Sequence, residues 1–101
     1  MALTYTFDEE LWLYSGEGAW YFITLPNEYA VELKSIASQP MRGFGSIKVR
    51  ATIGKTTWDT SLFPDVKRKS YLLPIKKEIR VSNILIPGDK PHVELIIKEQ
   101  F

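Results

Sequence analysis

The stretch "RGFGS", residues 42–46, is the part of the sequence that most resembles a phosphate-binding loop. It sets Arg42 beside Gly43 and Gly45, with Phe44 between the glycines. Phosphate-binding glycine motifs close onto a helix N-terminus, whereas these glycines precede a strand-like segment, and no G-x-x-x-x-G-K-[ST] motif is present. We therefore interpret the stretch as a tight turn into a strand, with Phe44 packed inward. The alternative keeps Arg42 as an anion contact at a pocket rim.

Other residue types that could do chemistry are sparse. His92 is the single histidine and cysteine is absent, so we expect no metal site and no other cofactor. The acidic run from Asp8 to Glu10 alternates its side chains between the two faces of a strand, which favours a solvated stretch over a cation site. No serine stands in a G-x-S-x-G motif. These absences predict a non-catalytic protein.

The tryptophans offer a third kind of site, an aromatic ligand pocket. Trp12, Trp20 and Trp58 belong to a residue type that usually packs in a core or against a hairpin. Trp58 is also a candidate for lining a pocket inside a barrel, beside Tyr71. Ser61 is the other polar group near this hypothetical pocket.

The nearly balanced net charge of +1 hides a basic middle segment. Residues 1–41 hold six acids and one base, a net of −5, and residues 42–80 hold ten bases and three acids, a net of +7. This middle segment is either a solvated strand face with a lysine-rich loop or a surface for an anionic partner. We expect weak, salt-sensitive binding of polyanions. The basic surface would consist of Arg42, Lys67, Arg68, Lys69, Lys76 and Arg80.

Length and composition fit one folded domain over residues 1–101, with 45% hydrophobic and 13% aromatic residues. The segment "MALTYTFDEE" lacks the basic start and apolar centre of a signal peptide, and the longest apolar run is too short to span a membrane. We expect a cytoplasmic protein without membrane contact, as a monomer or weak homo-oligomer.

Alternation of apolar and polar residues predicts mostly strands. Residues 3–14 follow a two-residue period, interrupted by Glu9 as a bulge, and should form a hairpin with residues 19–25. A second hairpin turns at Gly54-Lys55. Its register places Arg50 opposite Asp59 on the solvent face and Ala51 opposite Trp58 on the core face. Shorter strands are predicted at residues 71–74 and 92–98.

Two short helices are predicted, each behind a Leu-Pro pair. After Leu25-Pro26, apolar residues at helical spacing predict a helix that ends before Gln39-Pro40. After Leu73-Pro74, a second helix lies within residues 75–83. The two pairs stand 48 residues apart (73 − 25), so residues 20–53 and 69–97 should superpose as strand–helix–strand repeats. We predict an all-β fold with two short helices, a six-stranded double-split, pseudo-twofold β-barrel.

Several strings together carry a family resemblance: "RGFGS", "TIG", "TSLFP" and "YLLPIKKEIR". They resemble a small bacterial and archaeal domain of unknown function that often stands N-terminal to a YdeI/OmpD-associated domain of the bacteriocin-protection type. The resemblance implies a double-split β-barrel and transfers no catalytic residues. The run "LPIKKEIRVSNILIPGD" is similar to the "IPKEIR…GD" run of AbrB-type transcription factors and antitoxins.

Three function classes follow, in this order: a binding or accessory module for a small ligand or a protein partner, a nucleic-acid binder with an AbrB-like basic half, and an unrecognised enzyme. A twofold duplex reader needs two similar basic surfaces, but the first helix carries Glu28 and Glu32. Exposed aromatic residues beside the lysines would still suit a single strand. The predicted ligand-binding residues are Arg42, Trp58, Ser61, Tyr71, Lys76 and Arg80.

Overall fold

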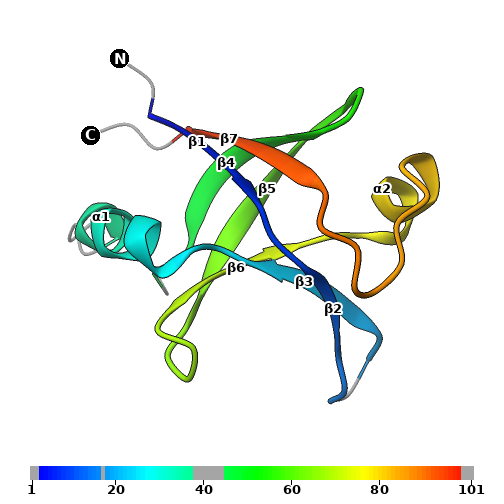
Figure 1. The fold of residues 1–101 in the computed structure, drawn as a ribbon. Helices are drawn as coiled ribbons and strands as arrows, with labels where there is room; N and C mark the ends of the chain where they lie inside the picture. The colour runs from blue at the N-terminus through cyan, green and yellow to red at the C-terminus, as the bar shows by residue number, and fades with distance from the viewer. Residues whose placement is uncertain (1–2, 17, 38–44, 99–101) are drawn as a thin grey trace.

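The computed structural model describes residues 3–16, 18–37 and 45–98, which form seven strands and two helices (Figure 1). In chain order the elements are β1 (Thr4–Asp8), β2 (Leu11–Tyr14), β3 (Trp20–Thr24), α1 (Asn27–Ala37), β4 (Ile47–Ile53), β5 (Thr56–Asp65), β6 (Ser70–Pro74), α2 (Lys77–Ser82) and β7 (His92–Ile97).

The strands form one antiparallel sheet in the order β1-β7-β4-β5-β6-β3-β2. Its two edge strands, β1 and β2, follow each other in the chain with only Glu9 and Glu10 between them. The sheet therefore curls back on itself, as Figure 1 shows. This confirms the predicted all-β, barrel-like fold with two short helices.

The predicted first strand is divided at Glu9 and Glu10, which is why seven strands are described where six were predicted. β1 pairs with β7, and β2 pairs with β3. Leu11, the first residue of β2, exchanges two 2.8 Å backbone hydrogen bonds with the loop before β7, donating to Asp89 and accepting from Gly88. These bonds redirect the chain from one half of the sheet to the other.

The β4–β5 hairpin has the predicted register. Arg50 lies opposite Asp59 and Ala51 opposite Trp58. Ala51 is fully buried, and Trp58 packs partly buried against the core. Gly54 forms the turn with φ of +59°, and a Cβ there would stand 2.7 Å from the side-chain oxygen of Asn83. The positive φ favours glycine at this position, and a larger residue would also have to displace the side chain of Asn83, the C-cap of α2.

The two strand–helix–strand units pair with each other as a twofold repeat requires: β3 with β6, and β4 with β7. Leu25 N–H donates to the Tyr71 carbonyl at 3.0 Å, and Ile75 N–H donates to the Tyr21 carbonyl at 2.8 Å. These reciprocal bonds align Tyr21 with Tyr71 and Leu25 with Ile75. The structural offset is therefore 50 residues (75 − 25) instead of 48, because Pro74 belongs to β6 whereas Pro26 lies beyond β3.

The helices lie on opposite sides of the curled sheet (Figure 1). α1 is fixed to β1 by two phenols: Tyr5 donates to Glu32 at 2.6 Å, and Tyr29 donates to the Thr6 carbonyl at 3.0 Å. At the end of α2, Asn83 donates to Thr56 at 3.1 Å. The largest fully buried core side chains are Leu11, Ile23, Leu25, Leu33, Ile47, Val49, Leu62, Leu73, Ile75, Val93 and Leu95.

Candidate functional site

A cleft of about 590 Å³ lies between the start of β3, the strand β5 and the helix α2. It exists because β3 and β6 are antiparallel, which brings the start of β3 beside the chain that leaves β6. The cleft thus joins residues far apart in the sequence. Its aromatic lining residues are Trp20, Tyr21, Trp58 and Phe63. Its basic lining residues are Lys76, Lys77 and Arg80.

The guanidinium of Arg80 is held in place at the wall of this cleft. Its Cζ lies 3.6 Å from the ring centroid of Tyr21, and its Nε donates to the Ile75 carbonyl at 3.2 Å. The ring packs on a face of the planar group and the Nε bond lies at its edge, so the two contacts together fix its orientation. A positioned guanidinium loses less side-chain entropy when it binds an anion than a freely rotating one does.

The acidic residue of the cleft already has cationic partners. Asp59 accepts hydrogen bonds from Arg50 Nε at 2.9 Å and from Lys98 Nζ at 3.0 Å. These bonds, Arg50 first, lower the pKa of Asp59 to about 2, so it is ionised at neutral pH. Lys76 lies 3.9 Å from Glu78, a long ion pair between exposed groups. The cleft therefore retains a positive balance.

An exposed aromatic face adjoins the cleft on the outside of β2 and β3. Three rings pack there around Phe22: Trp20 is parallel to it (5° between planes, centroids 6.0 Å apart), Trp12 is tilted at 5.4 Å, and Tyr14 meets it edge-on at 6.3 Å. A second cleft of about 430 Å³ lies over this face. It shares Trp20 and Phe63 with the first cleft, so these two side chains border both clefts.

A comparison with known protein families shows which family this domain belongs to. Residues 7–95 match a family described as a domain of unknown function, DUF1905. The chain belongs to the DUF1905 family. This confirms the predicted resemblance to a small domain of unknown function. No curated protein matches the chain.

The DUF1905 domain brings three of the six predicted ligand-binding residues together: Trp58, Lys76 and Arg80 line the first cleft. Tyr71 lies apart, in a cleft of about 470 Å³ beside α1, where burial raises the pKa of its phenol. Ser61 pairs with Lys48 between β4 and β5 and does not line the first cleft. Arg42 lies outside the described residues. A binding role for these side chains stays a prediction.

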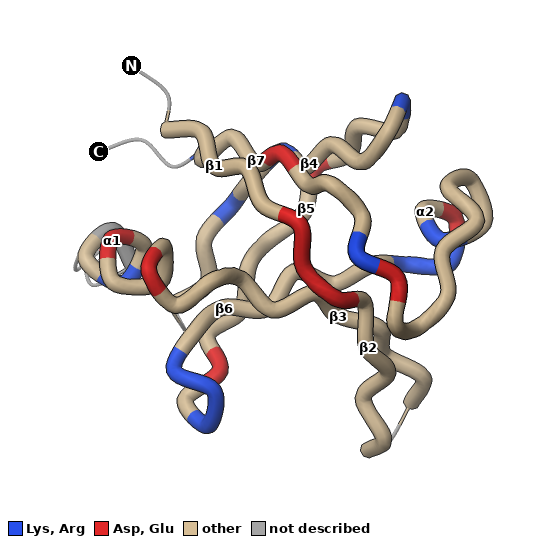
Figure 2. The backbone as a smooth tube through the Cα atoms, viewed as in Figure 1, with Lys and Arg blue, Asp and Glu red and all other residues tan. Residues whose placement is uncertain are grey.

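The basic residues of this DUF1905 domain do not form the single surface that their sequence proximity predicts. Lys67, Arg68 and Lys69 precede β6, whereas Lys76 and Arg80 follow it. Five residues of extended strand span about 17 Å, so the two groups lie at opposite ends of β6. Figure 2 shows them on separate sides of the molecule. The prediction of one basic patch was wrong because it took neighbours in sequence as neighbours in space.

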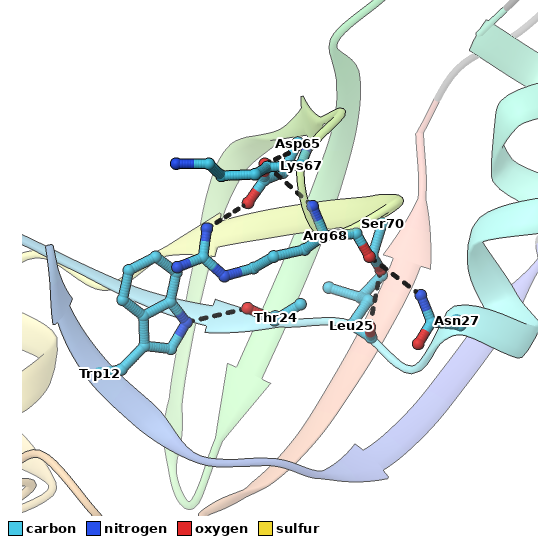
Figure 3. A network of polar contacts seen from close by, with 8 residues as sticks. All are labelled: Trp12, Thr24, Leu25, Asn27, Asp65, Lys67, Arg68 and Ser70. Atoms are coloured by element: carbon cyan, nitrogen blue, oxygen red, sulfur yellow. Dashed lines mark hydrogen bonds and ion pairs between the residues drawn. The ribbon is translucent and has the colours of Figure 1, made fainter.

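The turn before β6 uses its charge to hold the fold together (Figure 3). Asp65 accepts from Arg68 Nη1 at 2.7 Å and from the Lys67 N–H at 3.1 Å. Partial burial works to raise the pKa of Asp65, but the bonds from Arg68 and Lys67 outweigh it, so the pKa lies below its ordinary value. The guanidinium of Arg68 also lies 4.1 Å from a ring centroid of Trp12, whose indole donates to Thr24 at 2.8 Å.

The same turn is tied to the start of α1. Asn27 donates to the carbonyls of Arg68 and Lys69 at 3.2 and 3.1 Å, and the buried Ser70 hydroxyl donates to the Leu25 carbonyl at 2.7 Å (Figure 3). The lysine-rich segment is thus part of the scaffold, and the cleft beside α2 is the stronger candidate site.

Sequence reasoning missed Trp20, Tyr21, Phe63 and Lys77 as lining residues of the cleft. The available signal was the internal repeat. Antiparallel pairing of two strand–helix units sets the start of each strand beside the helix of the other unit, which places Trp20 and Tyr21 near α2.

The other chemical candidates lie elsewhere. His92 is exposed, and its Nδ1 lies 2.6 Å from a carboxylate oxygen of its cross-strand neighbour Asp8. Within the described ranges, no three histidine, aspartate or glutamate side chains gather as metal ligands would. Neither helix described is long and apolar enough to cross a membrane.

Proposed function

We propose that this DUF1905 domain is a non-catalytic binding module and that its cleft beside α2 takes a small organic anion with a flat apolar group. The observation that carries the proposal is the convergence of three cations, Lys76, Lys77 and Arg80, with aromatic side chains in one cleft. A flat group would contact the aromatic wall while its charge pairs with the basic wall.

The size and construction of the cleft support this proposal. Its volume of about 590 Å³ lies within the range usual for small-molecule sites. Arg80 is oriented by Tyr21 and the Ile75 carbonyl before any ligand arrives. Lys76 and Lys77 are exposed at the boundary of β6 and α2, where an anion can reach them.

Nucleic-acid binding is the second candidate function, and the exposed aromatic face is the observation that favours it. The AbrB-like comparison suggests duplex binding, but α1 carries Glu28 and Glu32 on the opposite side of the sheet from α2. Cations on one side of the domain only, combined with exposed aromatic rings, suit the unstacked bases of a single strand better than a duplex. A protein partner, such as a domain of the YdeI/OmpD-associated type, is the other alternative for this surface.

The proposal is tested with 1-anilinonaphthalene-8-sulfonate, a fluorescent probe that carries both a flat ring system and an anion. Titration of the native protein, followed by amide NMR, should shift resonances that line the cleft. Lys77→Ala should weaken binding by about tenfold, since it removes one charge contact. Lys67→Ala is the matched control, because it removes an exposed lysine at the other end of β6. Equal loss in both variants, or no binding at all, would contradict the proposal.

A further inference from the structure

We infer that the ligand of this surface is a nucleotide unit of single-stranded nucleic acid, with a base on the exposed rings and its phosphate at the basic wall of the cleft. The inference rests on the proposed function of the cleft and names its ligand. Trp20 marks the join, since it lines both the cationic cleft and the aromatic one.

The aromatic side of the surface exposes more ring area than packing of the fold requires. Trp20, Tyr14 and Phe63 are 52%, 45% and 45% exposed, although each is large and apolar. Trp20 and Phe22 already lie parallel, with 5° between their planes. A nucleobase that adds to such a stack buries apolar area on both partners without needing a particular sequence.

The charged side of the surface lies next to the exposed rings. Lys76, Lys77 and Arg80 share one cleft with Trp20 and Phe63. The acid that lines each cleft is paired with its own cations. Asp59 in the first cleft pairs with Arg50 and Lys98, and Asp65 in the second pairs with Arg68. A phosphate entering the cleft therefore meets exposed lysine charge, since the pair of Lys76 with Glu78 is a long one of 3.9 Å, and acids whose charge is already compensated.

Single-stranded nucleic acid fits this arrangement better than the alternatives. A duplex hides the faces of its bases in its own stack, so it cannot use Trp20. A free mononucleotide would fill the first cleft and leave the adjoining aromatic cleft over Phe22 empty. A single nucleic-acid strand occupies both clefts, because the base next to the one on Trp20 can reach the rings of Tyr14 and Phe63.

The test is fluorescence polarisation with a labelled oligothymidylate of about 15 nucleotides, a length that exceeds one small binding site. We expect binding at low salt whose logarithmic salt slope is about −2, as for up to three phosphate contacts on a single strand. Trp20→Ala should weaken binding at least about fivefold, the lower bound for loss of one stacked base. Trp20→Phe should restore most of it, because a ring remains.

Matched measurements separate this inference from the proposed function. Lys67→Ala should leave oligonucleotide affinity unchanged, and thymidine monophosphate should compete at least about tenfold less well than the strand. A duplex that binds as tightly as the strand, an equal affinity for the mononucleotide, or an unaffected Trp20→Ala variant would each overturn the inference. If the aryl sulfonate binds in a Lys77-dependent way but the oligonucleotide does not bind at low salt, the inference fails and the binding module stands.

Discussion

The guanidinium of Arg80 lies over the ring of Tyr21, with 3.6 Å between Cζ and the ring centroid. In the other half of the repeat the 50-residue offset puts Tyr71 in the place of Tyr21 and Ala30 in the place of Arg80. Ala30 is buried against the sheet, so that half has no equivalent cation stacked on its tyrosine. The two halves share a backbone plan but differ in charge where the cleft forms.

Replacing Arg80 should separate its charge from its geometry. Arg80→Ala removes the contact with Tyr21 and the bond to the Ile75 carbonyl, and we expect the free energy of unfolding to fall by roughly 0.5–1.5 kcal/mol. Binding of the aryl sulfonate should weaken by about tenfold. Arg80→Lys keeps the charge but loses the planar fork, so its affinity for the probe should lie between those of the native protein and of Arg80→Ala. Urea unfolding and probe titration measure both effects; identical affinities for the two variants would argue against a positioned guanidinium.

Asp59 should give an unusually low titration midpoint. Arg50 and Lys98 hold its pKa near 2 in the folded protein, against an ordinary value of 3.8. A lowered folded pKa means that the carboxylate stabilises the fold above pH 4 and that this contribution is lost as the pH falls toward 2. The urea midpoints of the native protein and Asp59→Asn should therefore differ at neutral pH and converge near pH 2. Carboxyl NMR measures the pKa directly, and a midpoint close to 3.8 would refute the pairing.

Ser70→Ala should destabilise the fold by about 1–3 kcal/mol, because it removes a donor from a buried carbonyl. The Ser70 hydroxyl donates to Leu25 at 2.7 Å, and both residues are buried. Ser82→Ala, at an exposed position at the end of α2, is the control and should change stability little. Chemical denaturation compares the two variants. Equal effects would show that the buried bond contributes no more than a surface hydroxyl.

Ile84→Gly should stabilise the protein by about 0.5–1 kcal/mol, against the usual trend for apolar residues. Ile84 follows the C-cap of α2 with φ of +52°, and the bonds from Ile84 to Val81 and from Leu85 to Arg80 form a Schellman motif. A β-branched residue is strained there, and its side chain is 86% exposed, so its burial compensates little.

The control for this variant is Ile86→Gly. Ile86 is also exposed, but it is not among the described residues with positive φ. Glycine at position 86 relieves no strain and adds freedom to the unfolded chain, so it should leave stability unchanged or lower it. Thermal unfolding of both variants measures the difference. A loss of stability in Ile84→Gly would indicate that its exposed side chain contributes to the isolated domain after all.

Local sequence pattern determined the elements and one complete register. The two-residue period and the Gly54 turn predicted the pairing of Arg50 with Asp59 and of Ala51 with Trp58, because a tight turn fixes which residues of a hairpin face each other. The bounds of α1 followed from local effects of proline: Pro26 suits the first turn of a helix, and Pro40 disfavours helix in the residue before it. The Leu-Pro pairs predicted two strand–helix–strand units, although the alignment on these pairs was two residues off; which strands of the two units pair was not predicted.

Tertiary structure alone decided the division of the first strand and the site. Glu9 interrupts the two-residue period and predicted a bulge, but the full separation of β1 from β2 depends on Leu11 bonding to Gly88 and Asp89, which lie far along the chain. The cleft depends on antiparallel packing of β3 against β6, which joins Trp20 to Arg80 across the sheet. Sequence neighbours such as Lys69 and Lys76 are instead separated by an extended strand. Strand pairing, and not distance along the chain, sets which charges and rings share a surface.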